Sequence, residues 1–170
     1  GPKGIGAAFM KSDAYGIVPI TAFMHGGEQE FGFRAGTHAV HNIVGFGKAA
    51  EIALRDLKKN EAHIKSLDDM LIAGISTIDG IHTTVDISKC LPGIVSLIVD
   101  KSDFHNERFI KKISEEVALS TGSACSAGEP SYVIQALGLA NEVTKVLRVS
   151  INKYTTEDDI NSFLSLLKTI

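Results

Sequence analysis

Cysteine, long apolar runs and excess charge are all scarce in this sequence, and each shortage argues against a class of protein. The 170 residues contain only two cysteines, Cys90 and Cys125, in unlike contexts. A disulfide framework is therefore not expected, and a reducing cytoplasm is the natural setting. No apolar run is long enough to span a membrane, and no signal-peptide pattern is present. Because the net charge is only −3, we expect neither a nucleic acid nor a membrane as a partner.

The apolar content and the length are sufficient for one domain with a real core. Hydrophobic residues make up 44% of the chain and charged residues 22%, the balance of an ordinary globular protein. The sequence starts at Gly1-Pro2-Lys3-Gly4 without an initiator methionine and runs at once into an apolar segment, 5–10, where we expect a short buried strand. This start favours the C-terminal part of a longer protein. A remnant of protease cleavage at Gly1-Pro2 is the alternative.

The spacing of apolar residues predicts the regular elements. A helix is expected over 38–59, and a second helical stretch carries an apolar stripe from Ile64 to Ile78 and ends at Gly80. Further strands and helices are expected, in chain order, as strands at 81–87 and 94–99, a helix over 109–117, a strand at 118–121, a helix at 130–137, a strand at 146–151 and a last helix capped by Thr156 and Asp159. This order predicts an α/β fold in which helices cover a small sheet.

Residues 11–37 have weak periodicity and many glycines, so we expect a long ordered loop. Loops of this length without regular structure are usually functional or disordered. This loop contains Met24-His25-Gly26-Gly27 and Arg34-Ala35-Gly36-Thr37, which is not the composition of a disordered segment.

One cysteine lies in a run of small residues, Ser120 to Tyr132, in which Gly122 and Gly128 flank Cys125 at equal distance. Such a segment buries little apolar area, so we expect an exposed and mobile loop. A thiol there, just before a helix that begins near Pro130, can ionise and reach a ligand. A small buried cysteine without a reactive role is the alternative.

Taken together, these motifs resemble a known family. They are Gly1-Pro2-Lys3-Gly4, Met24-His25-Gly26-Gly27, Arg34-Ala35-Gly36-Thr37, Ser120 to Cys125, Glu129-Pro130-Ser131-Tyr132-Val133, and Leu147-Arg148-Val149-Ser150 before Tyr154-Thr155-Thr156-Glu157. In this order they resemble the C-terminal part of a cysteine desulfurase of the NifS/IscS type, an enzyme of the aminotransferase class V superfamily that uses pyridoxal 5'-phosphate (PLP).

The resemblance implies the α+β small domain of a fold-type I PLP-dependent transferase, together with the end of its large domain. Residues 1–37 would end the large domain and connect it, 38–59 would form a linking helix, and 60–170 would form the small domain. The full enzyme would take sulfur from L-cysteine, releasing L-alanine and leaving a persulfide on Cys125. A sulfur-acceptor protein in iron–sulfur cluster assembly or tRNA thiolation would then receive the sulfur.

The resemblance also implies three site residues. Cys125 would be the catalytic nucleophile. Arg148 would bind the substrate carboxylate, because a planar guanidinium pairs with a carboxylate through two hydrogen bonds; a surface arginine on a strand is the alternative. Thr37 would bind the PLP phosphate of the other subunit of a homodimer, and a helix N-cap is the alternative or an additional role.

Other candidate residues receive no such role. His38 and His41 are three residues apart on the expected helix, but no cysteine or carboxylate cluster completes a metal site, so we expect no metal. Cys90 is expected to be structural, and Lys3 to be a turn residue. In the family the lysine that forms the Schiff base with PLP precedes the position of Gly1. We therefore expect this chain alone to be inactive.

Two departures leave other functions open. Only Ser126, Ala127 and Gly128 separate Cys125 from Glu129-Pro130-Ser131, where the family usually has a longer segment. Glu28 and Phe31 stand where glycine and arginine are more typical. The alternatives are a PLP-independent sulfur-carrier or interaction module, and a related lyase that acts on selenocysteine or cystine.

Overall fold

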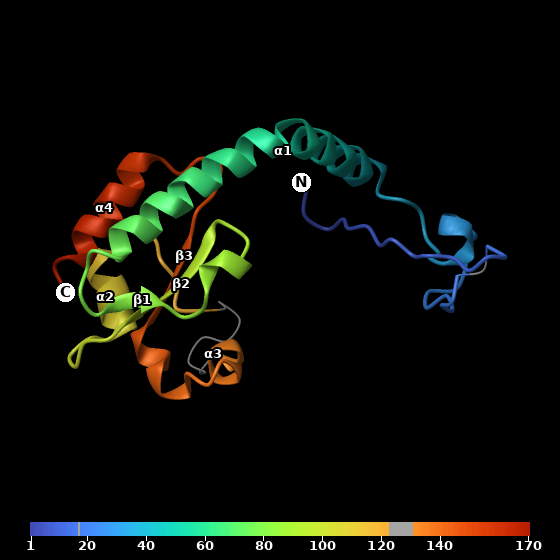
Figure 1. The fold of residues 1–170 in the computed structure, drawn as a ribbon. Coiled ribbons are helices and arrows are strands. Elements are labelled where there is room, and N and C mark those ends of the chain that lie inside the picture. The colour runs from blue at the N-terminus through green and yellow to red at the C-terminus, as the bar shows by residue number, and fades with distance from the viewer. Residues whose placement is uncertain (17, 123–130) are drawn as a thin grey trace. The chain divides into compact units, whose positions relative to one another are not determined.

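The computed structural model describes residues 1–16, 18–122 and 131–170. These residues divide into two compact units, Gly1–Leu57 and Lys58–Ile170. Helix α1 (Val40–Ile75) begins in the first unit and ends in the second (Figure 1). No helix among the described residues is both long enough and apolar enough to cross a membrane.

Helix α1 corrects the expectation of two helical stretches. Its 36 residues run without a break through residues 58–63, where the apolar stripe is interrupted. That segment contains neither glycine nor proline, and lysine, glutamate and alanine are good helix formers, so nothing in it ends a helix. The apolar pattern weakens there, but the backbone has no reason to leave the helical conformation.

In the first unit, the strand expected at 5–10 is not formed. These residues lie in neither a helix nor a strand, and the Phe9 side chain is 94% exposed. A strand needs a neighbour for its N–H and C=O groups, and the sheet formed by the described residues lies wholly in the second unit. The prediction was wrong because the apolar segment has no strand beside it.

The start of the chain packs along the first turns of α1 instead. The Asn42 side chain donates a hydrogen bond to the Lys3 carbonyl (3.5 Å), and an added Cβ at Gly45 would lie 3.1 Å from Pro2. Gly45 therefore permits the close packing that its place in a helix predicts, whereas Gly47 has open space around it.

The second unit is built on a three-stranded antiparallel sheet of order β1-β2-β3. The strands are β1 (Ile81–Thr83), β2 (Ile94–Val99) and β3 (Val146–Ser150), and Leu97 of β2 lies opposite Thr83 on one side and Leu147 on the other. The short elements around it are η2 (Ile87–Lys89), α2 (Asn106–Ile113), α3 (Tyr132–Ala136) and η4 (Ala140–Lys145), and α4 (Glu157–Leu167) ends the chain.

The two faces of this sheet are covered differently (Figure 1). On one face, the C-terminal half of α1 packs with α2 and α4 against alternate residues of β2 and β3; the buried members are Leu67, Leu71, Ile75, Val95, Leu97, Val99, Phe109, Ile113, Leu147, Val149, Ile160, Phe163, Leu164 and Leu167. On the other face, a smaller cluster joins Ile98 and Val146 to Ile134 of α3. Arg148 alternates with Leu147 and Val149, so it belongs to this second face.

Helix α4 begins as its sequence predicts. The Thr156 hydroxyl accepts a hydrogen bond from the Asp159 N–H (3.2 Å), and the Asp159 carboxylate accepts one from the Thr156 N–H (2.8 Å). This reciprocal capping box satisfies two N–H groups that the first helical turn leaves without partners. The hydrogen bonds from Thr156 lower the pKa of the Asp159 carboxyl group.

Candidate functional site

In the first unit, residues 24–37 fold back on themselves and end at Thr37. The Ala35 N–H donates to the Met24 carbonyl (3.3 Å), and Met24 forms an isolated β-bridge with Arg34. The short 3-10 turn η1 (Gln29–Gly32) lies between the two residues of this bridge, which is parallel. Although it lacks strands, this part of the long loop is ordered by hydrogen bonds, as its composition predicts.

The turn η1 contains two residues in the left-handed backbone region. Glu30 has φ 51° and Phe31 has φ 58°. For residues other than glycine this conformation costs about 1–2 kcal/mol each, so neighbouring contacts must hold it. The Glu30 carboxylate hydrogen-bonds the His38 ring at 2.8 Å, which ties the turn to the start of α1. Phe31, one of the two departures noted from the family pattern in this loop, is 98% exposed.

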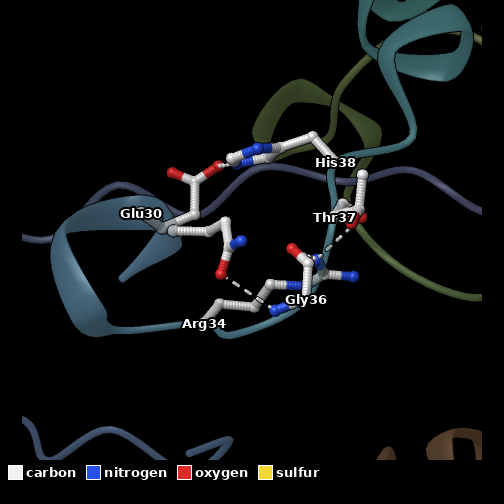
Figure 2. Close-up of polar contacts among 6 residues, drawn as sticks. Glu30, Arg34, Gly36, Thr37 and His38 are labelled. Carbon is white, nitrogen blue, oxygen red and sulfur yellow. Dashed lines mark hydrogen bonds and ion pairs between the residues drawn. The ribbon is translucent and has the colours of Figure 1, made fainter. Parts of the chain in front are cut away.

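Two further side chains hold the backbone that leads to Thr37 (Figure 2). The Arg34 guanidinium donates through Nη1 to the Gly36 carbonyl (2.9 Å) and more weakly to the Thr37 carbonyl (3.5 Å). The Gly36 N–H donates to Oε1 of Gln29 (3.0 Å). Gly36 has φ 103°, a conformation that L side chains rarely adopt. Both polar groups of Gly36 are therefore held by side chains of the same loop.

Sequence reasoning assigned no role to Gln29, Glu30 or Arg34, although a signal for one of them was present. An added Cβ at Gly27 would lie only 2.5 Å from Oε1 of Gln29. The lack of a side chain at Gly27 therefore leaves room for the end of the Gln29 side chain. A glycine just before a long polar side chain is consistent with such a close approach.

Thr37 itself is exposed and lies outside α1. The Ala39 carbonyl accepts the first hydrogen bond of the α-helical type, from the Ile43 N–H (3.0 Å), and α1 begins at Val40, so the N-cap position is Ala39 and not Thr37. The alternative role of Thr37 as a helix N-cap is therefore wrong. An exposed hydroxyl beside backbone N–H groups, with a guanidinium nearby, suits a phosphate. Its role toward PLP stays a prediction.

In the second unit, Arg148 lies in the middle of β3 and is half-buried. Its Nε atom is buried and has no hydrogen-bond partner among the residues that the structure describes. An unpaired buried N–H group of a cation is costly, so a site of this kind favours an anion that completes it. A carboxylate matches the planar guanidinium in geometry and charge.

The backbone of Arg148 connects this strand to the segment that leads to the cysteine. The Arg148 N–H donates to the Ser120 carbonyl (2.6 Å), and the Ser120 N–H donates to the Arg148 carbonyl (3.4 Å). The strand expected at 118–121 is thus reduced to this one bridge. The Ser120 hydroxyl donates to the Gly122 carbonyl (2.6 Å) and accepts from the Gly122 N–H (3.1 Å). Cys125 lies outside the described residues, five positions after Ser120.

The start of β3 is anchored from two neighbouring elements. The buried Asn106 side chain donates to the Val143 and Val146 carbonyls, each at 2.9 Å. Lys145 forms an ion pair with Asp100 at 2.8 Å. The hydrogen bond between them lowers the pKa of the Asp100 carboxyl group and raises the pKa of the Lys145 amine. These contacts position the strand that carries Arg148.

Other residues singled out in the sequence, Lys3, Cys90 and His38, make contacts within their own units. Lys3 lies in a turn, as predicted, and its carbonyl accepts from Asn42. Cys90 is exposed, and its thiol donates to the Asp86 carbonyl at 3.6 Å. His38 contacts Glu30, and no group of three metal-ligating side chains occurs within residues 1–16, 18–122 and 131–170.

Comparisons with known proteins agree on one family. Residues 1–163 match the model of the family described as Aminotransferase class-V. The cysteine desulfurase IscS of Ruthia magnifica subsp. Calyptogena magnifica is 37% identical over 172 aligned residues, which cover 99% of this chain. The cysteine desulfurase IscS of Neisseria meningitidis serogroup A is similar to the same extent. The chain spans 41% of the length of each of these relatives.

Solved structures show the same likeness. A NifS-like protein superposes with a TM-score of 0.72 and 28% identity, over 89% of this chain and 39% of that protein. DndA from Streptomyces lividans superposes with a TM-score of 0.59 and 28% identity, over 79% of this chain and 38% of that protein. The mixed helix-and-sheet fold expected from the sequence is therefore confirmed.

Proposed function

This chain belongs to the aminotransferase class-V family, and from this premise we propose that the protein containing it is a PLP-dependent cysteine desulfurase. The observation that carries the proposal is Arg148, whose buried Nε has no partner in the described part of the chain and whose strand pairs with Ser120, at the start of the cysteine segment. The 37% identity to proteins named cysteine desulfurase IscS supports it.

Arg148 holds the substrate in this proposal. Its guanidinium binds the carboxylate of L-cysteine, which supplies the acceptor that the buried Nε lacks. Because Arg148 lies in the middle of β3, in a sheet with a packed core on its other face, its backbone stays fixed while the substrate binds. The fixed guanidinium orients the sulfur atom of the substrate for attack.

Thr37 and its loop bind the phosphate of PLP. The exposed hydroxyl and the neighbouring N–H groups form a donor set that fits a phosphate, and Arg34 adds positive charge beside them. When bound, PLP withdraws electrons from the substrate carbon, which weakens its bond to sulfur. The contribution of this chain is to bind and orient the phosphate.

Cys125 accepts the sulfur. Its thiolate attacks the sulfur atom of the substrate, an S–S bond forms, and the bond between that sulfur and the substrate carbon breaks. The electron pair of the broken bond stays on the carbon, which takes up a proton as alanine is released. The persulfide on Cys125 then passes its outer sulfur to a thiol of an acceptor protein in iron–sulfur cluster assembly or tRNA thiolation.

A homodimer that shares its sites belongs to the same proposal. Three aromatic side chains in the described part of the first unit, Phe9, Phe23 and Phe31, are each more than 90% exposed. Exposed apolar groups on this scale favour a further protein surface that covers them. A second subunit would supply such a surface and would bring the Thr37 loop to the PLP phosphate of its partner.

The test is the variant Cys125→Ser in the complete gene product. It should form no persulfide from L-cysteine, because a hydroxyl at that position cannot carry the sulfur, while the absorbance of bound PLP stays unchanged. Mass spectrometry of the protein after one turnover measures the persulfide. Cys90→Ser is the matched control, since Cys90 is the other cysteine and is exposed. Normal persulfide or sulfide production by Cys125→Ser would overturn the proposal.

We propose, further, that the 170 residues alone do not desulfurate L-cysteine, since in the family the lysine that binds PLP precedes the position of Gly1. Incubating the isolated chain with PLP and L-cysteine measures this directly. Release of alanine above the level with PLP alone would contradict it.

A further inference from the structure

Side chains of the loop 24–37 hold the backbone at Gly36 and Thr37. Their hydrogen bonds fix the direction in which the carbonyl groups of these two residues point. The guanidinium of Arg34 binds the carbonyl oxygens of Gly36 (2.9 Å) and Thr37 (3.5 Å) through the same atom, Nη1 (Figure 2). Two successive carbonyl groups therefore point toward the same side. This is unlike a strand, in which successive carbonyls alternate.

In a trans peptide the C=O and N–H groups point in opposite directions. The described peptide bonds are all trans. Because Arg34 draws the carbonyls of Gly36 and Thr37 toward itself, the N–H groups of Thr37 and His38 are directed away from it, on the other side of the chain. Neither of these N–H groups donates to an acceptor within the part of the chain that the structure describes. Successive N–H groups that point the same way form an anion-binding concavity.

Gln29 completes the arrangement from the neighbouring peptide. Its Oε1 atom accepts the Gly36 N–H (3.0 Å), so that N–H is directed to Gln29 and not to the open side. The left-handed backbone of Gly36 (φ 103°) is what allows its N–H and C=O to meet both side chains. The two side chains therefore fix the orientation of the Gly36 backbone before any ligand binds.

We propose that Arg34, supported by Gln29, is a positioning residue that directs the N–H groups of Thr37 and His38 at the phosphate of PLP. The inference rests on the proposed function, since it assigns a role at the same phosphate site. Arg34 acts through the backbone: it keeps two carbonyl oxygens, which would repel a phosphate, turned away from it. Its charge adds a longer-range attraction for the same dianion.

The experiment compares PLP with pyridoxal, which lacks the phosphate, by titrating each into the apo form of the complete gene product and following cofactor absorbance. Arg34→Ala should weaken PLP binding about tenfold, the effect of one lost charge-assisted hydrogen-bond contribution, and leave pyridoxal binding unchanged. Gln29→Met, which keeps the length but removes the acceptor, should weaken PLP binding by a smaller factor. Arg34→Lys, which keeps a donor and the charge, should recover part of the loss.

The matched control is Arg55→Ala. Arg55 is an exposed arginine of the same unit whose hydrogen bonds go to the neighbouring Asp56, and its removal should leave binding of both ligands unchanged. The double variant Arg34→Ala with Thr37→Ala should lose less than the product of the two single losses, because both residues act on one phosphate.

Unchanged PLP binding by Arg34→Ala overturns the inference while leaving the proposed function standing. An equal loss of PLP and pyridoxal binding also overturns it, since that result indicates general damage to the loop. If Arg34→Ala does not fold, PLP and pyridoxal binding by Gln29→Met and Arg34→Lys are compared in the same way. A loss of PLP binding alone supports the inference, and unchanged PLP binding overturns it. A wild-type protein that binds no PLP overturns the proposed function, and the inference with it.

Discussion

The two units of this chain are held together in different ways. In Lys58–Ile170, three helices pack on one face of a sheet, and side chains such as Leu97 and Leu147 are fully buried. In Gly1–Leu57, no described residue is buried, and the loop that ends at Thr37 is shaped by polar side chains that contact the backbone. Of the two proposed site residues that the structure describes, Arg148 is therefore positioned by a hydrophobic core, whereas Thr37 is positioned by a few hydrogen bonds.

This difference has an energetic consequence. A core is stabilised in proportion to the apolar surface area that it buries, so it depends little on any single hydrogen bond. A loop shaped by single hydrogen bonds contributes about 0.5–1.5 kcal/mol per bond, so each one matters for the local geometry and little for global stability. Variants in the two units should therefore separate stability from binding.

The largest effect on stability is expected at the centre of the sheet. Leu97→Ala should lower the free energy of unfolding by about 2–5 kcal/mol, because it leaves a cavity among fully buried side chains. Leu54→Ala, at a 76% exposed position of the first unit, is the matched control and should change it by less than about 0.5 kcal/mol. Urea unfolding of the 170-residue chain measures both. Equal losses of unfolding free energy in the two variants would contradict the difference between the units.

A smaller effect, on binding and not on stability, is expected at Arg148. Arg148→Ala in the complete gene product should raise KM for L-cysteine about 10- to 100-fold, since hydrogen bonds to a charged group contribute about 1.5–3 kcal/mol. The melting temperature should not fall, because the Nε group that is removed has no partner in the described protein. Arg108→Ala, at an exposed arginine of the same unit, is the control. An unchanged KM would argue against the carboxylate role.

The smallest effect is expected at the start of α4. Thr156→Ala should lower the free energy of unfolding by about 1 kcal/mol, because it removes one half of the capping box. Ser165→Ala, which removes a hydroxyl bonded within the same helix, is the control and should have less effect. Urea unfolding at neutral pH measures the difference. An equal loss from both variants would mean that the cap is not what stabilises this end of the helix.

The same cap predicts a dependence on pH. The pKa of Asp159 is lower in the folded protein than its ordinary value of 3.8, so its contribution to stability is fully present above that value. The contribution is lost as the pH falls below 3.8 and through the lowered pKa. Unfolding curves of wild type and Asp159→Asn should therefore differ at neutral pH and converge in acid. A constant difference would contradict the role of the charged carboxylate.

Much of the second unit could be predicted from local pattern. The strand at 94–99 and the capping box at Thr156 were predicted at the residues where they occur, because a continuous apolar run and a Thr-x-x-Asp spacing are local signals. The strand at 81–87 is shorter than expected and ends at Thr83, because only one further hydrogen bond, from the Thr84 N–H to Ser96, continues its pairing with β2. The limits of a strand depend on its neighbour, which periodicity alone does not reveal.

The first unit was harder to predict. The apolar segment at 5–10 has strand composition but no strand beside it. The continuity of α1 from this unit into the second depends on backbone propensity at residues 58–63, where the apolar stripe is interrupted. The hydrogen bonds of Gln29, Glu30 and Arg34 to residues 36–38 were not foreseen. They join positions two to eight residues apart through a left-handed turn, and no periodic pattern encodes that geometry.

The sequence by itself determined the family, the order of the elements in the second unit and the identity of the candidate residues Thr37, Cys125 and Arg148, because these depend on local motifs and spacing. Only the tertiary structure decided that the buried N–H of Arg148 has no partner among the described residues, that its strand pairs with Ser120, and that Arg34 turns two carbonyls to one side. The physical reason is that contacts between different segments decide which polar groups find a hydrogen-bond partner and in which direction they point. These segments are distant in sequence or joined by a turn, and only folding brings them together.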